Sequence, residues 1–339
     1  MEQPNILIIY TGGTIGMIQN QSGVLLPFNF ENLLNYIPLL KNFPANISSY
    51  SFEEPIDSSD ANPDFWVKLV KIIGENYEKY DGFVILHGSD TMSYTASALS
   101  FMLENLAKPV ILTGSQLPIG LLRTDGRENI IAAIELACMQ YKNKPIINEV
   151  CVYFENSLYR GVRTSKYSAE NFDAFISPNY PPLAKVGIDI SLYEDRFWHN
   201  NLDFLITHTD LCKDIALIKL FPGINIKILE SVINVPDLKG LIIETYGSGN
   251  APSDKEFINV LETAIKKGIS ILNITQCTVG SVQQGKYATS TKLKEIGVIS
   301  GKDMTTEAAV TKMMYLLGKN FSKSEIAKLL PLSLRGELS

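Results

Sequence analysis

The stretch GFVILHGSDT, residues 82–91, decides the fold class of this chain. Residues 82–87 form a nearly continuous apolar run, and a Gly-Ser-Asp turn follows at residues 88–90. A short apolar run without alternation predicts a strand that is buried on both faces. The helical spacing of apolar residues over 91–106 predicts a helix directly after the turn. The stretch therefore predicts one strand–turn–helix unit of a parallel sheet.

The same unit recurs on both sides of this stretch. NILIIY, at residues 5–10, precedes a Thr-Gly-Gly-Thr turn, and PVILT, at residues 109–113, precedes a Gly-Ser turn. Further predicted elements are a strand over 149–154 and helices over 63–80 and about 125–141. Asn62 and Pro63 are typical of an N-cap and a first helical position. Strands that alternate with helices predict an α/β fold with a mainly parallel sheet flanked by helices.

A second alternating set of elements follows a polar stretch near residues 188–214. Its predicted strands cover 215–220, 241–245 and 269–275, and its predicted helices lie near 226–233, 253–267, 305–318 and 323–330. We therefore expect two α/β domains: a larger N-terminal one over 1–190 and a smaller C-terminal one over 215–339. Residues 191–214 are the predicted linker.

Composition and charge exclude several classes of protein. The chain has 339 residues, 45% of them hydrophobic, which is enough for a large core. Its net charge of -6 argues against nucleic-acid binding, which needs a basic face. Neither a signal-peptide pattern nor an apolar run long enough to span a membrane is present in the sequence. These features predict a cytoplasmic protein.

The cysteines and histidines carry no metal motif. The four cysteines, at positions 138, 151, 212 and 277, are far apart and read as free thiols in a reducing compartment. The three histidines are equally scattered. We therefore expect neither a metal nor a cofactor.

Three polar turns are expected to meet at one edge of the N-terminal sheet, because ligands bind beyond the carboxyl ends of parallel strands. They cover residues 11–14, 88–90 and 114–116. Thr14 could offer its hydroxyl to a small substrate where glycines allow close approach, or the two threonines could simply cap the turn. Asp90 could be an N-cap, a ligand for a substrate ammonium group, or both. The Ser and Asp side chains of the turn at 57–60 could be only caps and turn formers, or they could hydrogen-bond the carboxylate of an amino acid.

Taken together, the motifs resemble one family. YTGGTIGM, DSSD, HGSDTMSYTASALSFMLENL, KPVILTGSQLP, YRGVRTSK, YGSGNAP and NITQC occur in this order, and the likeness extends from about residue 4 to LRGEL near the C-terminus. The chain is similar to the bacterial type I asparaginases, the cytoplasmic branch of the asparaginase/glutaminase family. The resemblance implies hydrolysis of the side-chain amide of L-asparagine to L-aspartate and ammonia through a threonine-linked acyl-enzyme.

The resemblance also implies roles for single residues. Thr14 matches the nucleophile, Ser89 the second catalytic hydroxyl, and Asp90 and Lys166 the acid/base partners. Ser58, Ser59 and Asp90 match substrate-binding positions for the α-carboxylate and the α-ammonium group. Asn250 matches a residue that reaches into the neighbouring subunit's site, which implies a homodimer or a dimer of dimers. Without histidine, a lysine beside a carboxylate can relay the proton.

The chain departs from the family pattern at three places. Ser89 stands where threonine is usual, so the methyl group that fixes χ1 is missing. Residues 19–27, QNQSGVLLP, lack the lid tyrosine of many relatives; Val24 or Leu25 occupies its region, with Gly23 as a possible hinge. The third place is an effector site at which some relatives bind a second asparagine; Thr275 and Cys277 match part of this site.

The third departure concerns this effector site, because Glu244 occupies the position of an arginine in a cooperative relative. A reversed charge should weaken binding of the effector's carboxylate. We therefore expect weak or no activation by asparagine, and a Hill coefficient near one.

Other functions stay open at this stage. A glutaminase-asparaginase differs in substrate by one methylene, which a pocket discriminates by only about 1–3 kcal/mol. The amidase subunit of a tRNA-dependent amidotransferase shares the catalytic motifs, but the acidic charge disfavours contact with tRNA. A non-catalytic asparagine-binding protein would release no ammonia.

Overall fold

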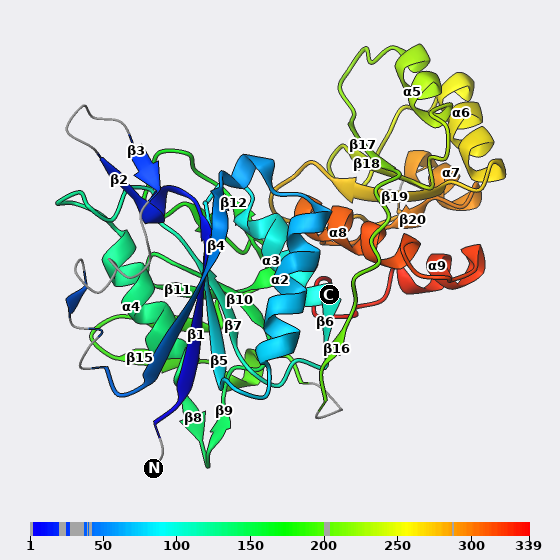
Figure 1. Ribbon diagram of the computed structural model, residues 1–339. Helices are drawn as coiled ribbons and strands as arrows, with labels where there is room; N and C mark the ends of the chain where they lie inside the picture. Colours follow the sequence, from blue (N-terminus) through cyan, green and yellow to red (C-terminus); the bar gives the residue numbers. More distant parts are fainter. Residues whose placement is uncertain are drawn as a thin grey trace. The chain divides into compact units, whose positions relative to one another are not determined.

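The computed structural model describes residues 3–19, 25–27, 37–38, 40, 43–199, 204–286 and 288–339. The chain forms two compact units, Met1–Thr209 and Asp210–Ser339 (Figure 1). This division confirms the predicted fold class of a larger and a smaller α/β domain. The finer bounds, with a linker over 191–214, stay a prediction.

An eight-stranded sheet, in the order β15-β14-β11-β10-β7-β5-β1-β4, forms the centre of the first unit (Figure 1). Strands β4, β1, β5, β7 and β10 run parallel, and β11, β14 and β15 continue the sheet antiparallel. The strand bounds are β1 Asn5–Gly12, β4 Asn46–Ile56, β5 Gly82–Leu86, β7 Val110–Thr113, β10 Val150–Phe154, β11 Ser157–Arg160, β14 Ala184–Val186 and β15 Ile190–Leu192. The four strands expected here, β1, β5, β7 and β10, are confirmed.

Helices cover both faces of this sheet. Helices α2 (Pro63–Asn76) and α3 (Met92–Met102) lie on one face, and α4 (Gly126–Ala137) lies on the other (Figure 1). Every residue of β5, β7 and β10 is buried. Two-sided burial is the reason why these strands read as continuous apolar runs.

The start of α2 follows the prediction, but all three helices end earlier than predicted, α2 at Asn76 rather than near residue 80. The Asn62 side chain accepts hydrogen bonds from the first turn of α2. Helix α3 ends at Met102, because Leu103–Glu104 pairs as β6 with β16 (Ile206–Thr207). Helix α4 ends at Ala137, because the next residues enter a hairpin, β8 (Gln140–Tyr141) and β9 (Lys144–Pro145). Apolar residues continue at helical spacing past the ends of α3 and α4, but the residues there pair as strands and do not extend the helices.

The strand order of the parallel sheet locates the expected ligand site. In chain order, β1, β4, β5, β7 and β10 occupy positions 2-1-3-4-5 of the parallel sheet when counted from β4. The connection after β1 therefore leads to one side of that strand, and the connection after β4 leads to the other side. In α/β sheets, ligands bind at such a switch point, which here lies beyond the carboxyl ends of β1 and β5. These ends carry the 11–14 and 88–90 turns.

Short strands and 3₁₀ turns complete the first unit. The hairpin of β12 (Ser165–Lys166) and β13 (Phe175–Ile176) carries Lys166. Other short elements are β2 (Met17–Gln19) with β3 (Leu25–Pro27), and the 3₁₀ turns η1 (Thr14–Gly16), η4 (Ser58–Asp60), η5 (Gly161–Arg163) and η6 (Glu194–Arg196). Strands β15 and β16 lie in the stretch that the sequence predicted to be irregular.

The second unit has its own parallel sheet, in the order β17-β18-β19-β20. Its strands are β17 Ile215–Lys219, β18 Gly240–Thr245, β19 Ser270–Thr275 and β20 Ile299–Ser300, and its helices are α5 Ile226–Ile233, α6 Lys255–Lys266, α7 Ala288–Glu295, α8 Thr306–Leu317 and α9 Lys323–Leu329. The predicted strands and helices are all present. Strand β20 and helix α7 were not predicted.

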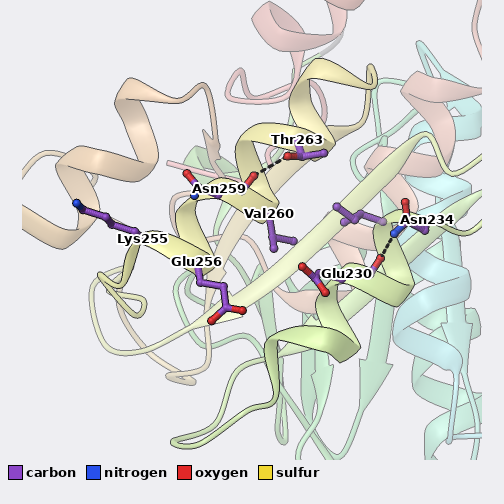
Figure 2. Close-up of a pocket in the computed structure, with 8 residues that line it drawn as sticks. Glu230, Asn234, Lys255, Glu256, Asn259, Val260 and Thr263 are labelled. Atoms are coloured by element: carbon purple, nitrogen blue, oxygen red, sulfur yellow. Dashed lines mark hydrogen bonds between the residues drawn. The ribbon is translucent and has the colours of Figure 1, made fainter.

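An open groove of about 620 Å³ lies between α5 and α6 (Figure 2). The buried Ile233 and Val260 line it together with charged and amide side chains. Asn234 and Thr263 donate hydrogen bonds to carbonyls one turn back on their own helices. Because these polar groups are satisfied locally, the groove is the ordinary gap between two amphipathic helices. It contains none of the predicted site residues.

Candidate active site

Glycines allow the turn after β1 to press against its neighbours. Gly12 and Gly13 have φ values of 125° and 83°. A Cβ atom on Gly13 would lie 2.4 Å from the backbone of Gly88, and one on Gly12 would lie 2.1 Å from the carbonyl oxygen of Ile56. Only glycine combines these φ values with such close approach. The 11–14 and 88–90 turns therefore meet, as the sequence predicted.

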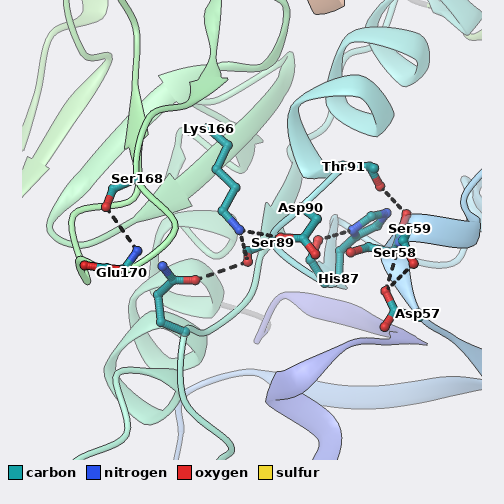
Figure 3. Close-up of polar contacts among 12 residues, drawn as sticks. Asp57, Ser58, Ser59, His87, Ser89, Asp90, Thr91, Lys166, Ser168 and Glu170 are labelled. Atoms are coloured by element: carbon teal, nitrogen blue, oxygen red, sulfur yellow. Dashed lines mark hydrogen bonds and ion pairs between the residues drawn. The ribbon is translucent and has the colours of Figure 1, made fainter.

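Ser89, Asp90 and Lys166 form one polar group at this edge (Figure 3). The Lys166 Nζ atom lies 2.9 Å from Ser89 Oγ and 2.5 Å from Asp90 Oδ1. The Lys166 side chain is 17% exposed, whereas that of Asp90 is 65% exposed. A largely buried ammonium group is thus paired with a carboxylate that stays open to solvent.

Hydrogen-bond chemistry fixes the direction of the contacts around Ser89. A lysine ammonium group only donates, so the Ser89 oxygen accepts from Lys166. The Ser89 hydroxyl donates its own proton to Gln116 Oε1, at 3.2 Å. The hydroxyl is therefore held from two sides.

The Asp-Ser-Ser-Asp turn lies beside this group (Figure 3). Ser58 is buried, and a Cβ atom on Gly88 would lie 2.5 Å from its Oγ. The carbonyl of Ser58 accepts a 2.6 Å hydrogen bond from Thr91 Oγ1, which joins the turn to the start of α3. Asp57 caps η4 and accepts hydrogen bonds from both the N–H and the hydroxyl of Ser59, at 2.9 Å each.

Asp90 is not the N-cap of α3, although the sequence allowed this role. Thr91 occupies the N-cap position, with no side-chain capping hydrogen bond. The Asp90 carboxylate turns to Lys166 instead. The acidic side chain therefore belongs to the polar group rather than to the helix end.

Thr14 opens η1, next to Gly13, and is half-buried. Gly13, the residue before Thr14, lies against the backbone of Gly88, so Thr14 stands close to the turn that carries Ser89. The predicted lid at residues 19–27 falls largely on residues 20–24, including Gly23 and Val24, which lie outside the described residues. The expectation that Val24 or Leu25 occupies the region of the lid tyrosine stays a prediction.

Asn250, Thr275 and Cys277 belong to the second unit. Asn250 closes a turn after β18 through backbone hydrogen bonds with Tyr246. Thr275 ends β19, and its Oγ1 accepts a 3.0 Å hydrogen bond from the N–H of Cys277. Cys277 is exposed and lines an open depression of about 270 Å³.

Glu244 is already engaged within the second unit. It accepts a 2.6 Å hydrogen bond from Thr306 Oγ1, and Lys219 Nζ lies 3.7 Å from its other carboxylate oxygen. The expectation of weak activation by asparagine stays a prediction.

Two contacts of the site were not foreseen as functional. Gln116 binds Ser89, and Thr91 binds the Ser58 carbonyl. Gln116 is the last residue of the third polar turn, so its position beyond the carboxyl end of β7 was the available signal. A metal-binding group of three or more His, Cys, Asp or Glu side chains is absent from the described part of the chain.

Hydroxyls, a carboxylate and a largely buried lysine lie together at the carboxyl ends of the parallel strands, and the family models give the class of this protein: the chain belongs to the asparaginase family. Residues 5–198 match the family model described as "Asparaginase, N-terminal", and residues 214–330 match "Glutaminase/Asparaginase C-terminal domain". Both halves of the chain therefore carry the family's domains.

Particular relatives cover the whole chain. "L-asparaginase 1" of Escherichia coli (strain K12) is 43% identical over 343 residues, which cover 100% of this chain and 99% of that protein. The crystal structure of L-asparaginase I from Vibrio cholerae is 40% identical, with a TM-score of 0.90 and 99% of each chain covered. A Mus musculus protein named "60 kDa lysophospholipase" is 40% identical over 98% of this chain and 62% of its own length.

Proposed function

We propose that this protein hydrolyses the side-chain amide of L-asparagine to L-aspartate and ammonia. The contact of Lys166 with both Ser89 and Asp90 carries the proposal, because it joins a hydroxyl to a proton relay without histidine. The names of the Escherichia coli and Vibrio cholerae relatives support the same substrate.

The proposed reaction has two halves. The Thr14 hydroxyl oxygen attacks the amide carbon, and its proton enters the group of Ser89, Lys166 and Asp90. The same group protonates the amide nitrogen, the C–N bond breaks, and ammonia leaves an acyl-threonine. Water then attacks the ester carbon, gives its proton to the group, and releases aspartate while Thr14 regains its proton.

Substrate binding draws on the neighbouring turn. Ser58 and Ser59 hold the α-carboxylate, and Asp90 holds the α-ammonium group. The exposed Asp90 side chain supports this double role, because one oxygen pairs with Lys166 while the carboxylate still faces solvent. The Ser59 hydroxyl donates to Asp57 in the structure, so it must rotate before it can donate to a substrate.

Ammonia release from L-asparagine and L-glutamine tests this function. We expect release from asparagine by the wild type and a loss of at least about 10³-fold in Thr14→Ala, because the attacking oxygen is gone. Comparable rates on both amides would favour the broader glutaminase-asparaginase.

The same assay can also refute hydrolysis. If the folded wild type binds asparagine but releases no ammonia, the hydrolase proposal is wrong and the asparagine-binding protein takes its place. Circular dichroism of both proteins shows whether they are folded.

We also infer that the protein works in the cytoplasm as a homodimer or a dimer of dimers. All four cysteines are unpaired, which suits a reducing compartment. Within the described ranges, no helix has both the length and the apolarity to cross a membrane. Cell fractionation with a tagged chain checks the compartment.

A further inference from the structure

Ser89 holds its hydroxyl in place without the β-methyl of a threonine. A threonine side chain has few allowed χ1 angles, whereas a serine hydroxyl rotates among three staggered positions with little difference in energy. Ser89 is only half-buried, so burial alone does not select one rotamer. Another group must hold the hydroxyl towards Lys166.

The side chain of Gln116 contacts Ser89 and a second loop. Its Oε1 accepts the Ser89 hydroxyl proton at 3.2 Å, and its Nε2 donates to the carbonyl of Asn171 at 2.9 Å. A carbonyl only accepts, so Asn171 determines which end of the Gln116 amide is the NH₂ group. The acceptor end must therefore face Ser89.

The backbone of Gln116 is anchored as well. Both carboxylate oxygens of the buried Asp125 accept from the Gln116 N–H, at 3.1 and 2.9 Å, and the Leu117 N–H adds a 3.1 Å bond. Asn129 donates to the carbonyl of Gly114 at 3.0 Å. The start of α4 thus fixes the turn from which the Gln116 side chain extends.

We propose that Gln116 is the positioning residue of Ser89: its amide oxygen selects the Ser89 rotamer and draws the hydroxyl proton away from Lys166. The Ser89 lone pairs then face the lysine, which keeps the proton relay connected. Gln116 supplies by hydrogen bonding the restraint that a threonine methyl would supply by steric exclusion. This inference rests on the proposed amide hydrolysis.

If Gln116 positions Ser89, the effect of replacing Gln116 depends on which residue occupies position 89. In Gln116→Met, the side chain keeps its length but loses the amide oxygen, so the Ser89 hydroxyl is free to rotate. We expect kcat for asparagine to fall about tenfold, with KM changed less than about twofold, because one hydrogen bond that orients the relay is lost. Gln116→Leu provides a second variant for the same test.

The Ser89→Thr background separates positioning from a general structural role. Threonine fixes its own χ1, so Gln116→Met should lower kcat less than about twofold in that background. A loss of folding or of turn geometry would instead lower kcat equally in both backgrounds. Gln140→Met is the matched control, because β8 lies in a hairpin near the amino ends of the parallel strands, away from the site (Figure 1), and kcat should not change.

The four proteins of this double-mutant cycle are compared by kcat, KM and thermal melting. Coupling of about fivefold or more between the two positions supports the proposal. Equal losses in the wild-type and Ser89→Thr backgrounds, or no loss in either, overturn it. The wild-type rate on asparagine tests the proposed function separately, because an inactive wild type would refute hydrolysis before the cycle begins.

Discussion

His87 is a buried histidine that the proposed chemistry does not use. Its Nδ1 lies 2.7 Å from the carbonyl oxygen of Gly88, and its Nε2 lies 2.9 Å from Thr95 Oγ1. The Gly88 carbonyl can only accept, so in the neutral ring Nε2 has no proton and accepts from the Thr95 hydroxyl, whose oxygen also accepts from Trp66 Nε1 at 3.0 Å. Nδ1 must then carry the ring proton. The imidazole is neutral and holds the turn that bears Ser89.

This neutral histidine should make the folded protein sensitive to mild acid. Burial lowers the pKa of His87 from its ordinary value of 6.5 to about 4. As the pH falls below 6.5, the unfolded chain binds a proton at this residue that the folded chain does not bind until about pH 4. The stability that depends on His87 is therefore complete above pH 6.5 and is lost between these two values.

Urea unfolding at pH 7 and pH 5 measures this effect. From pH 7 to pH 5, we expect the wild type to lose about 2 kcal/mol of unfolding free energy more than His87→Gln, whose amide does not titrate. Equal losses in the two proteins would show that His87 is charged in the folded state or is not buried as described.

At the scale of elements, a fully buried ion pair holds the C-terminal segment, residues 334–339, against α8. Lys312 Nζ lies 2.5 Å from Glu337 Oε1, and both side chains are 0% exposed. The Glu337 carboxylate also accepts from the N–H groups of Leu334 and Arg335. Lys312 donates to the carbonyls of Leu330 and Leu332. Every charge in this cluster is thus paired and hydrogen-bonded.

Breaking this pair should destabilise the protein strongly. Glu337→Gln leaves the ammonium group of Lys312 buried without a counter-charge, which costs about 3 kcal/mol or more. The matched control is Glu262→Gln, which removes the exposed i,i+4 pair with Lys266 on α6 and should cost less than about 0.5 kcal/mol. Guanidinium unfolding compares the two; similar costs would contradict the role of the buried pair.

At the scale of the whole molecule, the inferred assembly predicts that two defective chains can restore each other. If Asn250 completes the neighbouring subunit's site, Thr14→Ala and Asn250→Ala are each inactive alone. A mixed dimer then has one site with both residues intact. Random pairing in co-expressing cells should give about a quarter of the wild-type activity.

Co-expression of the two variants with different tags measures this complementation. Activity no higher than the sum of the separately purified variants would show that each site is built from one chain. Light scattering of the wild type reports the number of chains directly.

Local patterns in the sequence were sufficient for most of the elements around the site. The runs that became β5 and β7 are apolar throughout because helices cover both faces, and such runs are visible without any partner. Strand β4, NISSYSFEEPI, was not predicted, because it is a mostly exposed edge strand with few apolar residues. The ends of α3 and α4 were also misplaced, because the strands that replace the helices need partners elsewhere in the chain.

The sequence by itself determined the two α/β units, the three polar turns that meet at one sheet edge, and the asparaginase family, because apolar spacing and contiguous motifs are local properties of the chain. Only the tertiary structure decided the partners of the polar side chains. Lys166 reaches Asp90 across 76 residues, and Gln116 reaches Ser89 across 27. Such contacts depend on how the β12–β13 hairpin and the turn after β7 pack beside the turn after β5, and no local pattern in the chain encodes that packing.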